Sequence, residues 1–149
     1  MPAAFPNDSA RCCKRMETIY DPLRKKEVAL TPEEDVRQWF ITDVLHRGMG
    51  VPLHMMGSEV ALEAPGGKRL RADIVVYGRG DGAPRMVVEC KRPDVTIDQS
   101  VVDQAIRYHR VLGGVRWIVV TNGPKSFFFG RDGEQFSFLP VAPKWEEMQ

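Results

Sequence analysis

Two acidic residues and a lysine lie inside otherwise apolar segments of the chain. Asp73 interrupts the run 70–77, and Glu89 and Lys91 lie at the end of the run 86–91. If both runs are strands, alternate side chains share a face, so Glu89 and Lys91 point the same way. A carboxylate among apolar neighbours is poorly solvated and needs an opposite charge or a metal ion. These three side chains are therefore the candidates for chemistry.

The two runs are predicted to pair as a hairpin. The glycine-rich stretch 78–84 forms the turn, and pairing across it brings Asp73 close to Glu89. Two adjacent carboxylates repel each other, and a divalent cation removes that conflict. Their oxygens, with the backbone carbonyl of Cys90, suit Mg²⁺ or Mn²⁺. Such a cation activates water, and the Lys91 ammonium would orient that water or stabilise charge on a phosphoryl group under attack.

A purely structural role would also explain these residues. Asp73 and Glu89 could form a buried charge cluster with Arg71 and Lys91, in which ion pairs satisfy the carboxylates without a metal. Spacing and burial pattern alone do not separate this charge cluster from a metal site.

A first helix is predicted from Thr31 to about His46. Thr31 is a suitable N-cap, Pro32 fits the first helical position, and Glu34 completes a capping box. Apolar residues then recur at helical spacing. Capping alone therefore explains Glu34, without any part in a site.

A second helix is predicted from about Ile97 to Leu112. It places Gln104 and Tyr108 one turn apart on the same face. Either both face the site, where Gln104 would hold a water or a phosphate, or they are a surface glutamine and a core tyrosine.

The remaining pattern predicts an α/β domain with a mixed sheet flanked by helices. The segment 19–30 looks irregular, and an antiparallel meander follows the first helix. After the second helix come a short buried strand and a terminal hairpin. The expected strands are 59–63, 70–77, 86–91, 117–121, 125–129 and 135–139.

Length and composition fit one globular domain. The chain has 149 residues, which we divide into a disordered tail, 1–18, and a single domain, 19–149. No apolar run is long enough for a bilayer and no signal peptide is evident, so we expect a cytoplasmic protein without membrane contact. The three cysteines include no CxxC pair, which argues against structural zinc.

Charge does not by itself indicate a nucleic-acid coat, because the net charge is only +1. Binding to DNA would need local basic patches, each of which could also be ordinary solvated surface. We select Arg71, Arg92 and Arg107 as phosphate contacts.

Several motifs occur in a fixed order between residues 19 and 123. They are DPLRKK at 21–26, LTPEE at 30–34 with VRQ at 36–38, RADIVVY at 71–77, VECK at 88–91 with Pro93, Gln104 with Tyr108, and TNG at 121–123. In this combination the chain resembles the N-terminal domain of type I restriction enzyme R subunits.

The resemblance implies the restriction-endonuclease-like fold, also called PD-(D/E)xK, and a Mg²⁺- or Mn²⁺-dependent DNA endonuclease. Asp73 and Glu89 match its metal-binding acids, and Lys91 matches its catalytic lysine. Gln104 matches a glutamine that this branch places four residues before a tyrosine. Glu34 is our choice for a glutamate in the first helix that commonly completes the acidic site.

The resemblance stops short of the whole R subunit, which continues into a large ATP-driven translocase. This chain ends at Gln149. We therefore expect a nuclease core that acts alone, as a homodimer, or with a separate motor or targeting protein. The alternative is a catalytically silent DNA- or protein-binding module on the same fold. A third alternative is a structural protein in which the acids only form ion pairs.

Overall fold

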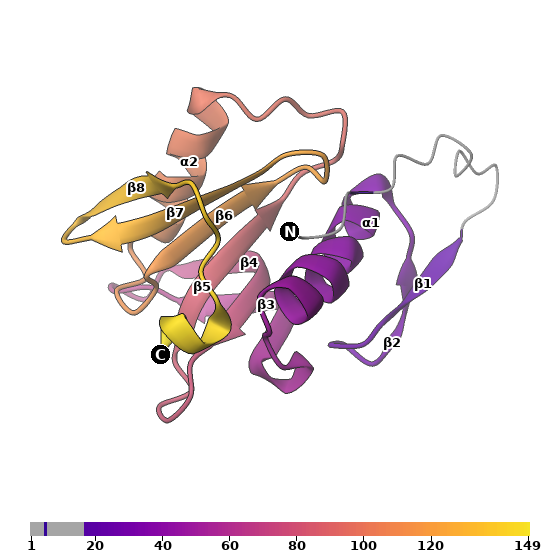
Figure 1. Cartoon of the computed structure of the whole chain (residues 1–149), viewed down its shortest axis with the longest axis horizontal. Coiled ribbons are helices and arrows are strands. Elements are labelled where there is room, and N and C mark those ends of the chain that lie inside the picture. Colours follow the sequence, from indigo (N-terminus) through magenta and orange to yellow (C-terminus); the bar gives the residue numbers. More distant parts are fainter. Residues whose placement is uncertain (1–4, 6–16) are drawn as a thin grey trace.

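A six-stranded mixed sheet forms the centre of the computed structural model, which describes Phe5 and residues 17–149 (Figure 1). The first three strands form an antiparallel meander, the third and fourth are parallel, and the last three are again antiparallel. The predicted α/β class and mixed sheet are confirmed. In spatial order the strands are β3 (Met56–Glu63), β4 (Arg69–Tyr77), β5 (Pro84–Cys90), β6 (Trp117–Thr121), β7 (Ser126–Asp132) and β8 (Gln135–Leu139).

The first helix consists of an α-helical and a π-helical part. It begins as α1 (Pro32–Trp39) and continues as η2 (Phe40–Gly48), where Met49 N donates to Val44 O five residues back. The predicted N-cap is present, because the Thr31 hydroxyl accepts from Glu34 N at 3.1 Å. The second half of the predicted capping box is wrong: Thr31 N donates to Ala29 O, and the Glu34 carboxylate binds other side chains.

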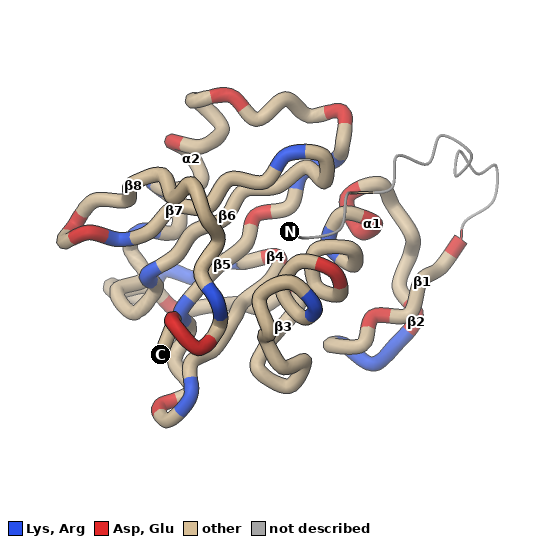
Figure 2. The backbone as a smooth tube through the Cα atoms, viewed as in Figure 1, with Lys and Arg blue, Asp and Glu red and all other residues tan. Residues whose placement is uncertain are grey.

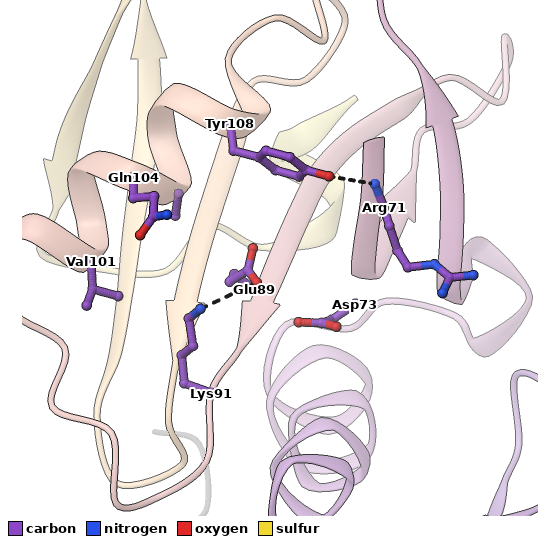
Figure 3. Close-up of a pocket in the computed structure, with 8 residues that line it drawn as sticks. Arg71, Asp73, Glu89, Lys91, Val101, Gln104 and Tyr108 are labelled. Carbon is purple, nitrogen blue, oxygen red and sulfur yellow. Dashed lines mark hydrogen bonds and ion pairs between the residues drawn. The ribbon is translucent and has the colours of Figure 1, made fainter. Parts of the chain in front are cut away.

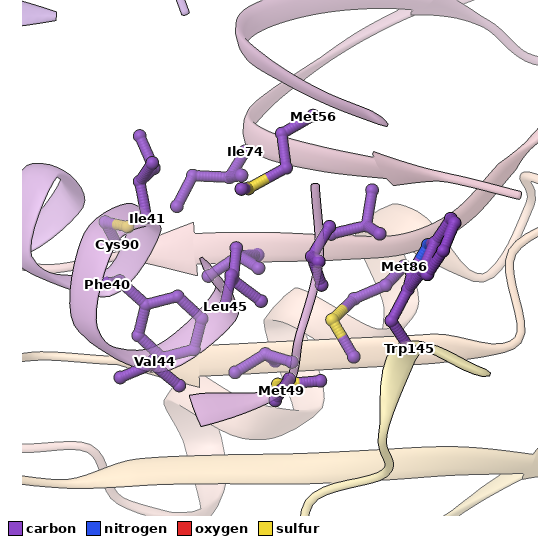
Figure 4. Close-up of a cluster of buried hydrophobic side chains, with 14 of the residues drawn as sticks. Phe40, Ile41, Val44, Leu45, Met49, Met56, Ile74, Met86, Cys90 and Trp145 are labelled. Carbon is purple, nitrogen blue, oxygen red and sulfur yellow. The ribbon is translucent and has the colours of Figure 1, made fainter. Parts of the chain in front are cut away.

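The helices cover opposite faces of the sheet, and strand alternation supplies an apolar layer to each. Residues from α1 and η2 pack on Ile74 of β4 and Val88 of β5 (Figure 4). The other face contributes Val75 and Val87 to a second cluster that includes Ile106 of α2 (Gln99–His109). β4 and β5 lie between these layers and are therefore buried on both faces, which accounts for their almost continuous apolar runs.

A small β-hairpin precedes the first helix, so the prediction that residues 19–30 are irregular is wrong. Strands β1 (Thr18–Asp21) and β2 (Lys26–Ala29) pair antiparallel. The fully buried Asp21 carboxylate accepts from Leu23 N and Arg24 N and shapes the turn. Lys25 adopts φ 54° there, a left-handed conformation that hydrophobic periodicity does not reveal.

Several strand limits also differ from the predictions. β3 begins at Met56 rather than at residue 59, and β7 extends to Asp132. β5 ends at Cys90, so Lys91 lies one residue beyond it, at the start of the connection to α2. Most of the predicted tail, 1–18, lies outside the described residues. No helix in the described part of the chain is long and apolar enough to span a bilayer.

Candidate active site

The pairing of β4 with β5 brings the two predicted acids together. Their register aligns Ile74 with Val88, and one further step places Asp73 beside Glu89. Cys90 N donates to Asp73 Oδ2 at 2.7 Å, which ties the carboxylate to the end of the neighbouring strand.

The two carboxylates open onto a cavity of about 350 Å³ between the sheet and α2 (Figure 3). Strands β4 and β5, with Lys91 just beyond β5, supply one wall, and α2 supplies the other. The lining residues are Arg71, Asp73, Glu89, Lys91, Val101, Gln104, Ala105 and Tyr108. Four of the five residues predicted as catalytic therefore border one cavity.

Asp73 is held from the α1 side of the site. Arg37 Nη2 donates to its Oδ1 at 3.3 Å, and Cys90 N donates to Oδ2. Burial nevertheless raises the pKa of Asp73 to about 6, and the negative charge of Glu89 adds to this effect. The neutral form of this carboxyl is thus strongly favoured compared with an aspartate in water.

Glu89 is held from the α2 side and titrates in the opposite direction. Burial raises its pKa, but the hydrogen bond from His109 and the charge of Lys91 outweigh burial, so the net pKa is lowered. His109 Nε2 lies 3.1 Å from Glu89 Oε2, and Lys91 Nζ lies 3.8 Å from Oε1. Glu89 is accordingly the carboxylate that stays ionised.

Arg37 connects Asp73 to acids of two other elements. It is 4% exposed, and its guanidinium lies 3.2 Å from Glu34 Oε1, 2.6 Å from Glu59 Oε1 and 3.3 Å from Asp73 Oδ1. Glu34 also pairs with Arg24 at 2.7 Å. Glu34 therefore does not line the cavity, and it reaches the site only through Arg37.

Glu59 adds a carboxylate that the sequence did not reveal. The β3–β4 pairs Ser58↔Ile74 and Val60↔Ala72 bracket Glu59 and Asp73, so the two acids lie on adjacent strands. Glu59 adopts φ 55°, and a strand residue in the left-handed region costs free energy. Its ion pair with Arg37 accompanies this strained backbone.

Three residues of the site were missed from the sequence: Arg37, Glu59 and His109. Arg37 belongs to the VRQ motif at 36–38, which was a usable clue. His109 had no ligand spacing to other histidines, and the backbone of Glu59 leaves no mark in the sequence.

Tyr108 is not a core residue, so that alternative is wrong. It is 39% exposed, and its hydroxyl accepts from Arg71 N at 3.2 Å across the cavity (Figure 3). Gln104 is exposed one turn earlier and borders the same cavity. Both members of this pair therefore face the acids.

Of the three arginines predicted to contact phosphates, one borders the cavity and two lie outside it. Arg71 borders the cavity, and its guanidinium lies 3.5 Å from Glu59. Arg92 is exposed and pairs with Asp94 at 3.4 Å, while Arg107 is exposed on α2; neither lines the cavity. Figure 2 shows basic and acidic positions scattered over most elements.

The donor set fits a cation that retains waters. Within the described residues, no group of three or more His, Cys, Asp or Glu side chains forms a metal cage. Mg²⁺ commonly binds through one or two carboxylates with water and substrate oxygens, and Asp73 and Glu89 supply that number. The predicted charge cluster is present only in part, because Lys91 pairs with Glu89 but Arg37, not Arg71, pairs with Asp73.

A mixed sheet with helices on both faces, and with two acids and a lysine where adjacent strands meet, has the restriction-endonuclease-like architecture. The family model described as type I restriction enzyme R protein N terminus matches residues 32–143. This chain therefore belongs to the family of type I restriction enzyme R protein N termini, as the sequence motifs predicted.

A solved structure supports the same fold. It is a fragment assigned to an HsdR subunit of a type I restriction enzyme from Vibrio vulnificus YJ016. The TM-score is 0.57 at 21% sequence identity, over 80% of this chain and 24% of that chain. This chain thus corresponds to about a quarter of that fragment. Comparison with curated proteins finds no match.

Proposed function

We propose that this chain is a divalent-metal-dependent endonuclease domain that hydrolyses DNA phosphodiester bonds. The observation that carries the proposal is the convergence of Asp73 and Glu89 from paired strands on one open cavity, with Lys91 beside them. Membership in a restriction-enzyme family makes DNA the substrate class that we propose.

Asp73 and Glu89, with the backbone carbonyl of Cys90, would hold Mg²⁺ or Mn²⁺. When bound, such an ion supplies Lewis acidity at the phosphoryl group and a more acidic water. The pKa of about 6 at Asp73 supports this role, because a nearby dication offsets the cost of ionising a half-buried carboxyl.

Three neighbouring side chains would have separate roles in the proposed reaction. Lys91 Nζ lies 3.8 Å from Glu89 Oε1 and is partly exposed, so it can orient a water or donate to a phosphoryl oxygen. Gln104 would hold the attacking water or a phosphate from the opposite wall. Glu34 would act indirectly, because Arg37 connects it to Asp73.

The basic residues near the cavity would hold the DNA backbone. Arg71 borders the cavity, and Arg92 and Arg107 lie on the connection to α2 and on α2 itself. Phosphate contacts of this kind make binding weaker as salt rises. A cut through both strands would need a second active site, supplied by a homodimer or by a partner that carries the motor or the target recognition.

The test is cleavage of plasmid, linear and single-stranded DNA with Mg²⁺, Mn²⁺ or EDTA. Wild type should nick DNA only with a metal, and Lys91→Ala should remove the nicking. Lys144→Ala is the matched control, since Lys144 contacts Gly48 O and lies outside the cavity. Absence of nicking in wild type, or equal nicking in Lys91→Ala, would contradict the proposal.

A catalytically silent binding module is the second candidate. The ion pairs of Arg37 with Asp73 and of Lys91 with Glu89 favour it, because each acid already has a cationic partner without a metal. Such a module should bind DNA equally well in EDTA and take up no Mn²⁺ in calorimetric titration. The nuclease should take up Mn²⁺ and lose this uptake in Glu89→Gln.

A further inference from the structure

We propose that His109 is a positioning residue for Glu89: as the Nε2–H tautomer it holds Oε2, which leaves Oε1 directed at the cavity. This inference rests on the proposed function, because it concerns how that function's acidic site is held. His109 is the last residue of α2, is 0% exposed and does not line the cavity.

The two oxygens of Glu89 have separate neighbours. His109 Nε2 lies 3.1 Å from Oε2, whereas Lys91 Nζ lies 3.8 Å from Oε1. Because Lys91 borders the cavity and His109 does not, Oε1 is the oxygen on the open side of the site. Figure 3 shows the cavity side of Glu89, with the Lys91 side chain reaching toward its carboxylate.

The imidazole ring is held firmly enough to position its partner. Ala105, one turn earlier on the same face of α2, is also buried. The Tyr108 ring packs edge-on against the His109 ring at 4.8 Å between centroids. Leu112 N donates to His109 O at 3.1 Å, which closes the end of the helix. A fully buried ring that packs against Tyr108 and binds Glu89 has little freedom to rotate.

The hydrogen-bond partners identify the tautomer. A carboxylate only accepts hydrogen bonds, so Nε2 must carry the hydrogen that faces Glu89. His109 Nδ1 is buried and has no hydrogen-bond partner among residues 17–149. Nε2 is therefore the ring nitrogen that donates to Glu89.

A glutamate without this contact would rotate about its side-chain bonds, and binding a metal would then require ordering it. Partners that orient metal ligands typically change metal affinity by about 10–100-fold when they are removed. The contact therefore predicts an effect on metal affinity that is separate from any effect on folding.

The first test uses calorimetric titration with Mn²⁺ on the full chain. His109→Leu removes the donor, and we expect its dissociation constant for Mn²⁺ to rise about 10–100-fold. His109→Gln retains a donor near the position of Nε2, and we expect affinity close to wild type. Unchanged affinity in His109→Leu, or equal losses in both variants, would overturn the inference, since equal losses indicate shape rather than hydrogen bonding.

The second test does not depend on a bound metal, and its main readout uses the wild-type chain. Nitrogen-15 NMR of the wild-type histidines should show His109 as the Nε2–H tautomer, with exposed His54 as an internal reference. In Glu89→Gln the Nε2 resonance should shift. An Nδ1–H tautomer in wild type would overturn the inference even if the domain cleaves DNA. If wild type fails to bind Mn²⁺ although the Nε2–H tautomer is present, the result contradicts the proposed nuclease function and not the contact between His109 and Glu89.

Discussion

The two carboxylates of the site lie on neighbouring strands, yet opposite sides of the molecule hold them by different means. On the α1 side, Asp73 shares Arg37 with Glu34 and Glu59, and its pKa is raised to about 6. On the α2 side, Glu89 has its own partners in His109 and Lys91, and its pKa is lowered.

The difference between the two sides lies in how easily each carboxyl ionises. One arginine shared among four acids, with Glu33 the most distant at 3.9 Å, cannot compensate all of them, so Asp73 remains costly to ionise and would gain the most from a cation. Glu89 is already ionised and directed by its partners, so it would be the first anchor for a metal. In the proposed metal site, Glu89 would thus supply a preformed ligand, and Asp73 would ionise more readily once the metal is bound.

The largest expected effect is the loss of DNA cleavage when either acid is replaced by its neutral amide. If the proposed function is correct, Asp73→Asn and Glu89→Gln should each lower metal-dependent DNA cleavage by about 10²–10³-fold or more, because either change removes a charge that would hold the cation. Plasmid nicking rates measure this loss, with circular dichroism as the check on folding. Asp132→Asn, at the exposed end of β7, is the control and should cleave normally. Activity in only one of the two site variants would show that the acids do not act as a pair.

A large effect on stability should come from the α1 side. Arg37→Met leaves four carboxylates without their shared cation, and breaking a buried ion pair in this way typically costs about 3–5 kcal/mol of unfolding free energy. Chemical denaturation measures that loss. Arg47→Met is the matched control, because Arg47 is exposed and pairs only with Asp43, so it should cost less than about 1 kcal/mol. Equal costs would mean that the Arg37 network adds nothing to stability.

The pH dependence of stability should have opposite signs for the two acids. Asp73 has a folded pKa of about 6, above its unfolded value of 3.8. The folded state therefore holds this proton more tightly, so the stabilising contribution is full below pH 3.8 and is lost as pH rises through 6. A shift of about two units corresponds to about 3 kcal/mol. Without metal, Asp73→Asn should therefore be more stable than wild type at pH 7.5, and the gain should vanish near pH 4.

Glu89 should behave in the reverse way, because its folded pKa lies below the unfolded value of 4.5. Its contribution is present above pH 4.5 and is lost as pH falls through the lower folded pKa. Glu89→Gln should therefore destabilise the domain at pH 7.5. Urea denaturation of wild type and both variants at pH 4 and 7.5 decides the matter, and the same sign for both substitutions would refute the contrast.

The smallest expected effects come from the two helix N-caps. The Thr31 hydroxyl accepts from Glu34 N on the α1 side, and Asp98 Oδ1 accepts from Val101 N on the α2 side. Thr31→Ala and Asp98→Ala should each cost about 1 kcal/mol of unfolding free energy. A difference in metal affinity between these two variants would show which helix the site depends on more.

The sequence predicts the parts of this molecule that local patterns encode. Alternation and turn residues identified the meander, and polar residues inside apolar strands identified Asp73 and Glu89 as unusual. Lys91 was found as well, but the partners Arg37 and His109 were not, because they reach the two acids from distant segments. A left-handed residue inside a strand, as at Glu59, leaves no periodic pattern.

The same limit explains the errors in secondary structure. The β1–β2 hairpin has strands of only four residues, and its turn depends on the buried Asp21 and the left-handed Lys25. The capping box predicted at Glu34 was half wrong because tertiary ion pairs with Arg24 and Arg37 compete for its carboxylate. Local propensity cannot anticipate such competition.

The parallel step between β5 and β6 affects the order in which the chain folds. β4 and β5 follow each other and pair as a hairpin, so the two acids meet through local contacts. β6 can pair with β5 only after the chain has crossed over through α2, and closing that longer loop is slower. The contact of Glu89 with His109, 20 residues further along the chain, belongs to this crossover, because His109 is the last residue of α2.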